Sequence, residues 1–175
     1  YVGQMTPQKG VSVLIDALIS LDDPQIGCWI VGGGKFTKDF EAKLQKTVRD
    51  SKSKTTIKFF GFQSDPRPFY HASDWHIAPS IYEEPLGNVV QEAKSCNTPS
   101  IVSPNGGLPE LIVNKVNGLI LTSVSLKEIS RTIRNIADHR DNYQGYGDKA
   151  YDSLDGYLDN NTFNKKWRAV LEILS

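Results

Sequence analysis

The chain has 175 residues, which suits one domain with its own hydrophobic core. Its 20 Lys and Arg residues balance 20 Asp and Glu residues, so bulk charge favours neither nucleic acid nor an anionic membrane surface as a partner. The two cysteines, Cys28 and Cys96, have neither metal-site spacing nor the density of a disulfide framework, and Cys28 is expected to be a buried thiol within an apolar run.

Strand-like and helix-like segments alternate over the first two thirds of the chain. Apolar residues at helical spacing, beginning at Val11 and Leu14, predict an amphipathic helix, and a continuous apolar run at 26–31 predicts a buried parallel strand. The expected strands are 1–4, 26–31, 56–60, 75–78, 100–102 and 118–121. The expected helices between them are 9–20, 38–49, 65–71 and 86–96, followed by helical segments at 126–137, 144–154 and 162–174.

This alternation predicts parallel strands joined by right-handed crossovers, hence an α/β fold with a Rossmann-like doubly wound sheet. In such sheets ligands bind beyond the carboxyl ends of the strands. Glycines or polar residues lie at four expected strand ends, in the segments 3–4, 32–34, 61–62 and 80–84. We expect these segments to meet in one crevice.

An anion site is expected at the start of the helix 86–96. Pro85 suits the first helical position, where a missing N–H costs nothing. The residues that follow would present free backbone N–H groups to an anion, helped by the helix dipole, and Gly87 would let a ligand approach closely. These candidate donor-binding residues are Leu86, Gly87, Asn88 and Val89.

Two carboxylates flank that anion site. Glu84 precedes the helix, and Glu92 follows eight residues later, which places it roughly on the same side. A carboxylate can accept paired hydrogen bonds from a sugar diol. Phosphate on N–H groups with hydroxyls on carboxylates is the chemistry of a nucleotide sugar.

The segment from Pro79 to Glu110 resembles the donor-binding motif of retaining GT-B glycosyltransferases of family 4. The matching residues are Pro79, Ser80, Glu84, Glu92, Thr98, Pro99 and the Gly-Gly-Leu-Pro-Glu run at 106–110. The resemblance covers nearly all of the chain but only the C-terminal half of a family member. It implies one nucleotide-sugar-binding domain over 1–175, with C-terminal helices at about 141–175. It also implies an N-terminal acceptor domain that is absent from this chain, so the isolated domain is expected to be inactive alone.

The resemblance also implies a role for each matching residue. Glu84 would contact the donor sugar and lie closest to catalysis; its neighbour Glu83 fits less well, because the Pro-Leu-Gly register follows Glu84. Lys9 would hold the donor diphosphate as a second catalytic residue. Glu92 would bind the ribose.

Three further positions bear on donor binding. Gly3 lies at the first strand end, and Gln4 stands where the family usually has Arg, so one cationic contact to the diphosphate is missing. Phe62 would contact the base. Simpler interpretations remain open: Lys9 as a solvated lysine, Phe62 as a core residue, Glu92 on a solvated helix face, and two loop carboxylates that merely favour a helix N-terminus.

The function implied is transfer of a sugar from a nucleoside diphosphate sugar to a hydroxyl of a saccharide or lipid-linked acceptor, in cell-surface polysaccharide or glycolipid synthesis. No metal, no other cofactor and no nucleic-acid partner are expected. The expected location is the cytoplasm, with peripheral association at the inner face of the cell membrane as an option. The alternatives are a catalytically silent donor-binding module, which Gln4 favours, and a nucleotide-sugar epimerase or glycogen or sucrose synthase relative of the same fold. A dinucleotide-dependent oxidoreductase is disfavoured, because the glycines at 32–34 lack the Gly-x-Gly-x-x-Gly spacing.

Overall fold

The computed structural model describes residues 1–34, 37–154, 161, 164–165 and 168. The helix predicted at 162–174 lies largely outside these residues. None of the helices in the described part is long and apolar enough to cross a membrane.

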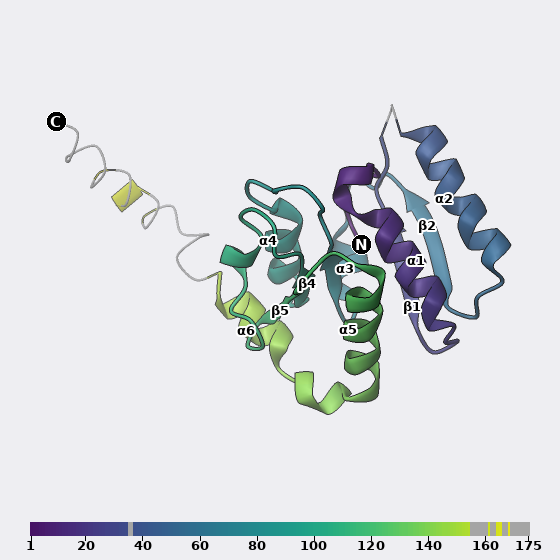
Figure 1. Cartoon of the computed structure of the whole chain (residues 1–175). Helices are drawn as coiled ribbons and strands as arrows, with labels where there is room; N and C mark the ends of the chain where they lie inside the picture. Colours follow the sequence, from purple (N-terminus) through teal and green to yellow (C-terminus); the bar gives the residue numbers. More distant parts are fainter. Residues whose placement is uncertain (35–36, 155–160, 162–163, 166–167, 169–175) are drawn as a thin grey trace.

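Strands and helices alternate as predicted (Figure 1). The strands are β1 (Gly27–Val31), β2 (Thr56–Gly61), β3 (His76–Ala78), β4 (Ser100–Val102) and β5 (Gly118–Ile120). The helices are α1 (Val11–Leu21), α2 (Lys38–Ser51), α3 (Arg67–His71), α4 (Asn88–Ser95), α5 (Leu126–Asp138) and α6 (Tyr146–Asp152). Three 3₁₀ turns join them, η1 (Pro7–Lys9), η2 (Pro109–Leu111) and η3 (Arg140–Tyr143).

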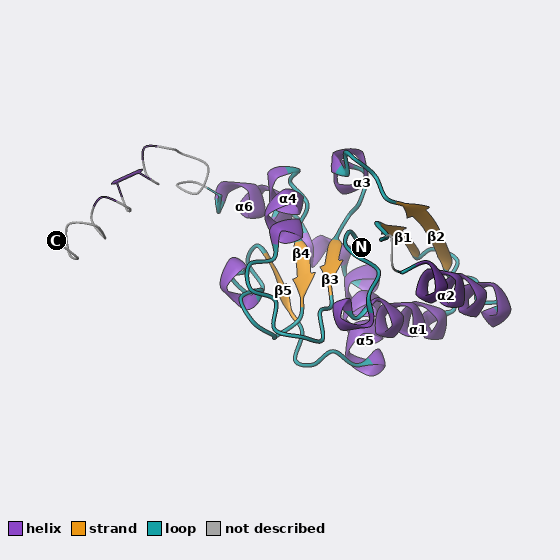
Figure 2. Cartoon of the chain, turned by 90° about the horizontal axis from the view of Figure 1, so that it is seen from above, coloured by secondary structure: helices purple, strands orange, loops and turns teal. Residues whose placement is uncertain are grey.

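All of these strand pairings are parallel, in two groups: β1 with β2, and β3-β4-β5 in that order. The strand predicted at 1–4 is reduced to one bridge, between Val2 and Val31. Seen from above, α1, α2 and α5 lie on one side of the strands and α3, α4 and α6 on the other (Figure 2). Helices on both faces of parallel strands confirm the doubly wound α/β fold.

The main core lies between the strands and the layer that contains α1 and α5. Helix α1 turns Val11, Leu14, Ile15 and Leu18 inward, as its apolar spacing predicts. Ile129 of α5 packs into the same cluster. Each such fully buried side chain contributes about 1.5–3 kcal/mol to folding. Cys28 packs against this cluster but is only partly buried, which corrects the expectation of a buried thiol.

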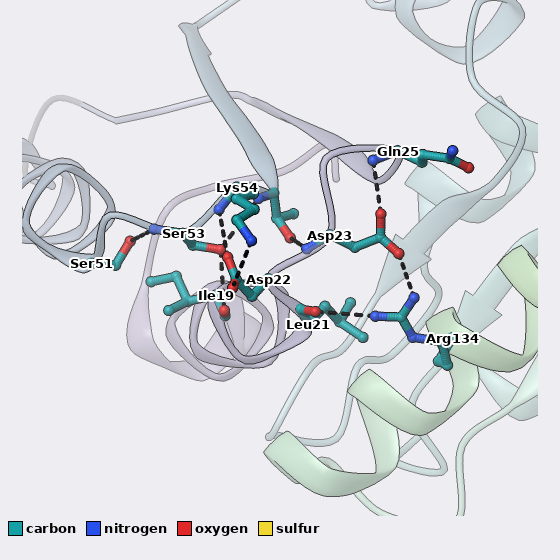
Figure 3. Close-up of polar contacts among 10 residues, drawn as sticks. Ile19, Leu21, Asp22, Asp23, Gln25, Ser51, Ser53, Lys54 and Arg134 are labelled. Atoms are coloured by element: carbon teal, nitrogen blue, oxygen red, sulfur yellow. Dashed lines mark hydrogen bonds and ion pairs between the residues drawn. The ribbon is translucent and has the colours of Figure 1, made fainter.

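A polar cluster fastens the C-terminal end of α1 to α5 (Figure 3). The Asp23 carboxylate forms an ion pair with Arg134 of α5. The guanidinium of Arg134 also donates a hydrogen bond to the carbonyl of Leu21 at 3.0 Å. The N–H of Asp23 donates to Thr55 Oγ1 at 3.0 Å, just before β2. Three segments far apart in the sequence therefore meet around one aspartate.

Candidate functional site

Three of the predicted strand-end segments converge through backbone contacts. The N–H of Gly32 donates to the carbonyl of Gly61 at 2.8 Å, and the N–H of Gly3 donates to Val31 at 3.0 Å. A Cβ on Gly32 would lie only 1.8 Å from the carbonyl oxygen of Gly3, so no side chain fits there. These contacts bring the segment 3–4 next to the carboxyl ends of β1 and β2, as expected of parallel strands.

The loop that carries Lys9 crosses closely over the end of β3. The N–H of Ile81 donates to the carbonyl of Gln8 at 2.8 Å. Gly10 has a φ of +71° and would bring a Cβ within 1.9 Å of the carbonyl oxygen of Pro79. A glycine is required at this crossing both for the left-handed backbone and for the close approach. The crossing directs Lys9 toward the segment 80–84.

Lys9 and Glu84 form an ion pair at this crossing. Lys9 Nζ lies 2.5 Å from Glu84 Oε2 and 3.4 Å from the hydroxyl of Tyr82. The Tyr82 hydroxyl donates to Glu84 Oε1 at 3.1 Å, and Ser80 Oγ donates to Glu84 Oε2 at 3.2 Å. The side chains of Lys9 and Glu84 are 23% and 15% exposed, so the pair is shielded yet open to a ligand. Lys9 is therefore not merely a solvated surface lysine.

The pair keeps both groups charged. Burial alone would raise the pKa of the Glu84 carboxyl, but hydrogen bonds from Lys9, Tyr82 and Ser80 outweigh it and hold that pKa below its usual value. Burial would likewise lower the pKa of Lys9, but its bonds to Glu84 and Tyr82 raise it overall. The site thus holds a cation and an anion side by side at neutral pH.

The Gly-Gly-Leu-Pro-Glu segment supports the backbone around Glu84. The N–H of Gly107 donates to the carbonyl of Glu84 at 2.7 Å, and a Cβ on Gly106 would lie 2.4 Å from the Glu84 nitrogen. The side-chain amide of Asn105 donates to the carbonyls of Ser80 and Ile81, both at 2.9 Å. These contacts hold the loop 80–84 in one shape, so Glu84 is positioned from both sides.

The start of α4 differs from the prediction. The helix begins at Asn88, and Gly87, with a φ of +66°, is its N-cap. Pro85 and Leu86 therefore lie in the preceding loop, and Leu86 is exposed. The left-handed backbone of Gly87 interrupts the helix before Asn88, and an added Cβ there would lie 2.4 Å from Leu108 Cδ2. Of the four predicted backbone donors, Asn88 and Val89 lie in the first helical turn, whereas Leu86 and Gly87 do not.

Glu92 lies on α4, apart from the Lys9–Glu84 pair. Its carboxylate is exposed but accepts a hydrogen bond from Tyr70 at 3.0 Å, and Tyr70 is a buried residue of α3. Burial, with the nearby Glu92 carboxylate, raises the pKa of the Tyr70 hydroxyl, which stays protonated as a donor. Glu92 is thus oriented by a neighbouring element and is more than a solvated helix position.

Two more predicted residues lie at the strand ends. Phe62, directly after β2, is 78% exposed, which shows that its interpretation as a core residue is wrong. Gln4 is exposed, and its carbonyl accepts a hydrogen bond from the Tyr1 hydroxyl at 2.7 Å. Burial, with a smaller contribution from the Glu84 carboxylate, raises the pKa of that hydroxyl.

Sequence reasoning missed two residues that organise the site, Tyr82 and Asn105. Tyr82 lies two residues before Glu84 in a loop, where an aromatic hydroxyl directly before two carboxylates could have indicated a polar role. The Pro-Asn-Gly stretch that contains Asn105 predicts a turn, but it does not predict which carbonyls the Asn105 side chain contacts. In the part of the chain that the structure describes, no three His, Cys, Asp or Glu side chains gather as a metal site would require.

The chain resembles known glycosyltransferases over most of its length. The model of the family "Glycosyl transferases group 1" matches residues 1–153. A lipopolysaccharide core biosynthesis glycosyltransferase, LpsE of Rhizobium meliloti, is 30% identical over 135 residues, which cover 77% of this chain and 38% of LpsE. An uncharacterized glycosyltransferase of Methanocaldococcus jannaschii is 33% identical over 123 residues, covering 68% of this chain and 30% of that protein. This chain thus spans about a third of the length of these relatives.

Solved structures agree with the sequence relatives. Anabaena HepE in complex with UDP superposes with a TM-score of 0.87 at 27% identity, covering 98% of this chain and 47% of HepE. A complex of HepE with UDP-glucose gives a TM-score of 0.85. From the family match over residues 1–153, the chain belongs to the group 1 glycosyl transferases, and its doubly wound fold is that of their GT-B structures.

Proposed function

We propose that this chain is the donor-binding domain of a retaining glycosyltransferase that uses a nucleoside diphosphate sugar. The observation that carries the proposal is the Lys9–Glu84 pair, which lies where the strand-end loops converge. A cation for the diphosphate and a carboxylate for the sugar hydroxyls lie side by side there, near the N-terminus of α4. UDP and UDP-glucose are bound by HepE, which supports a uridine nucleotide as the donor.

Each candidate residue then has a chemical task. Lys9 and the free N–H groups of Asn88 and Val89 would stabilise negative charge on the leaving diphosphate, which is preorganised transition-state stabilisation. Glu84 would accept hydrogen bonds from the sugar and Glu92 from the ribose. Phe62, exposed directly after β2, would contact the base. No metal ion or other cofactor is included in this proposal.

The wider role is proposed on the relatives. LpsE is named for lipopolysaccharide core biosynthesis, which supports a role in cell-surface polysaccharide or glycolipid synthesis. Because the chain spans about a third of such relatives, we place the acceptor site on a further domain. Closing that domain over the crevice would exclude water, so the isolated chain should bind donor and transfer little sugar.

Calorimetric titration with UDP, GDP, ADP and dTDP tests the proposal. We expect selective binding of UDP, weakened about tenfold or more by Lys9→Met, since removing one charge-assisted contact costs about 1.5–3 kcal/mol. Glu92→Ala should also weaken binding. Lys43→Met is the matched control, because Lys43 is exposed on α2.

Two results would contradict the proposal. Equal losses in Lys9→Met and Lys43→Met would show that Lys9 acts only through net charge. Absence of binding of any of the four nucleotides, both by this chain and by a version joined to an acceptor domain, would favour another ligand. A protein that binds UDP but stays inactive with its acceptor domain, also after Gln4→Arg, would instead be a silent donor-binding module.

A further inference from the structure

Tyr70 is a buried tyrosine whose hydroxyl contacts a side chain on the surface of the neighbouring helix. The residue is 2% exposed and packs in a small core cluster with Ala93 and Cys96. Its hydroxyl donates to Glu92 Oε2 at 3.0 Å, across the contact between α3 and α4. A buried hydroxyl needs a hydrogen-bond partner, and here the partner belongs to an exposed residue. The core therefore holds this surface carboxylate through a single bond.

Two contacts fix the position of Tyr70 itself. Thr98 is buried just before β4, and its Oγ1 donates to the carbonyl of Tyr70 at 2.8 Å. The ring of His76, on β3, meets the Tyr70 ring edge-on, with the ring centroids 5.4 Å apart. His76 is held in turn by Ser100 of β4, whose Oγ lies 3.1 Å from Nδ1. The hydroxyl of Tyr70 is thus positioned by residues in and next to two central strands.

This arrangement orders Glu92 before a ligand binds. A glutamate that is free on a helix surface samples several rotamers, and ordering it on a ligand costs free energy that weakens binding. Because Tyr70 is fixed by the core, its bond to Glu92 removes part of that cost in advance. The bond uses one lone pair of Oε2, so the carboxylate can still accept paired hydrogen bonds from a diol.

We propose that Tyr70 is a positioning residue through which the site distinguishes ribose from deoxyribose. Glu92 contacts the ribose in the proposed function, on which this inference rests. Tyr70 holds the carboxylate where both hydroxyls of the ribose diol can donate to it. A 2′-deoxynucleotide leaves one of these two hydrogen bonds unmade. Since Tyr70 is buried, it acts on the nucleotide through Glu92 and not by direct contact.

Calorimetric titration of the 175-residue chain with UDP and with 2′-deoxy-UDP tests this role. The original chain is compared with Glu92→Ala, Tyr70→Phe and Tyr146→Phe. Tyr70→Phe removes the hydroxyl and keeps the ring that packs on His76. Tyr146→Phe is the matched control, because Tyr146 is also buried and its hydroxyl donates to the carbonyl of Lys115 at 2.6 Å, outside the proposed site. The melting temperature of each protein is measured alongside.

The measured quantity is the ratio of the two dissociation constants. The original chain should bind UDP about tenfold or more tightly than 2′-deoxy-UDP, because one hydrogen bond to a charged group is lost. Glu92→Ala should reduce this preference to about twofold or less. Tyr70→Phe should reduce it to about threefold, mainly by weakening UDP, since the carboxylate must then be ordered on binding. Tyr146→Phe should keep the original ratio even if its melting temperature falls.

The ratio separates positioning from a merely structural role. If the Tyr70 hydroxyl only stabilised the fold, its removal would weaken both nucleotides alike and leave the ratio unchanged. An unchanged ratio in Tyr70→Phe, together with its loss in Glu92→Ala, would overturn the inference and leave the ribose contact of Glu92 in place. An equal fall of the ratio in Tyr146→Phe would also overturn it.

Other results would contradict the proposed function as well. Equal binding of UDP and 2′-deoxy-UDP by the original chain would exclude Glu92 as the ribose contact, and the role of Tyr70 would fall with it. Absence of binding of either nucleotide, by this chain and by a version joined to an acceptor domain, would contradict the donor site as a whole.

Discussion

Lys9 and Glu84 form an ion pair with each other, which has a consequence for ligand binding. An incoming diphosphate competes with Glu84 for the ammonium group of Lys9, and incoming sugar hydroxyls compete for the carboxylate. Tyr82 contacts both, with its hydroxyl on Glu84 and its ring centroid 5.1 Å from Lys9 Nζ. The tyrosine can therefore keep the two side chains in place while the ion pair loosens.

The stability of the chain should depend on pH through this pair. Glu84 has a pKa below 4.5 in the folded state, so its contribution is present above about pH 4.5 and is lost as pH falls through the lowered value. Lys9 has a pKa above 10.5, so its contribution is present below that pH and is lost as pH rises further. Lys9→Met should remove about 1 kcal/mol of unfolding free energy between pH 5 and 10 and less outside this window.

Urea unfolding from pH 3 to pH 11 measures this difference. Glu83→Gln serves as the comparison, because Glu83 is exposed beside Glu84. A difference between Lys9→Met and the original chain that stays constant across the range would mean that the ion pair adds nothing to stability.

At the scale of elements, the site depends on how closely loops cross. The η1 turn carries Lys9, and Gly10 follows it directly. A Cβ added to Gly10 would lie 1.9 Å from the carbonyl oxygen of Pro79. Such a contact with backbone atoms cannot be relieved by rotating a side chain. The crossing thus couples the position of Lys9 to the end of β3.

Gly10→Ala should lower the unfolding free energy by about 2–4 kcal/mol, because the left-handed backbone and the contact with Pro79 both oppose a Cβ. It should also weaken nucleotide binding by displacing Lys9. Gly145→Ala isolates the first cause: Gly145 has a φ of +75° but no atom within 4 Å of an added Cβ. That variant should lose only about 1 kcal/mol. Similar losses of unfolding free energy in the two variants, measured by urea unfolding, would show that the backbone at the crossing shifts to accommodate the added Cβ.

Across the whole molecule, Arg134 connects distant parts of the chain. Helix α5 follows β5, whereas Asp23 lies between α1 and β1, so their ion pair joins the two strand groups on one face (Figure 3). Because β1-β2 and β3-β4-β5 form separate groups, α1 and α5 and this ion pair bridge them.

Arg134→Met should therefore lower the melting temperature by about 3 °C or more at pH 7. Arg131→Met is the control on the same helix, because Arg131 pairs with Glu128, three residues away on the same helix. The N–H of Gln25 and the guanidinium of Arg134 lower the pKa of Asp23 below 3.8, so the loss should shrink once pH falls well below that value. Equal melting temperatures of the two variants, measured by calorimetry, would show that the Arg134–Asp23 ion pair does not stabilise the contact between α1 and α5.

Much of the architecture follows from the sequence alone. Apolar periodicity located the strands from 26 to 121 and the helices up to 154 to within a few residues, because burial of one helix face and of whole strands imposes that pattern. The motif between Pro79 and Glu110 identified Glu84, which the structure shows bonded, and set it apart from exposed Glu83.

Only the tertiary structure decided which distant residues meet. Lys9 and Glu84 are 75 residues apart, and no local pattern states that a hydroxyl from Tyr82 bridges them. The helix starts at Asn88 because Gly87 adopts a left-handed backbone, and Phe62 is exposed beyond the end of β2. Local periodicity reports which face of an element is buried, whereas contacts between elements depend on the energy of the packed whole, which no single segment contains.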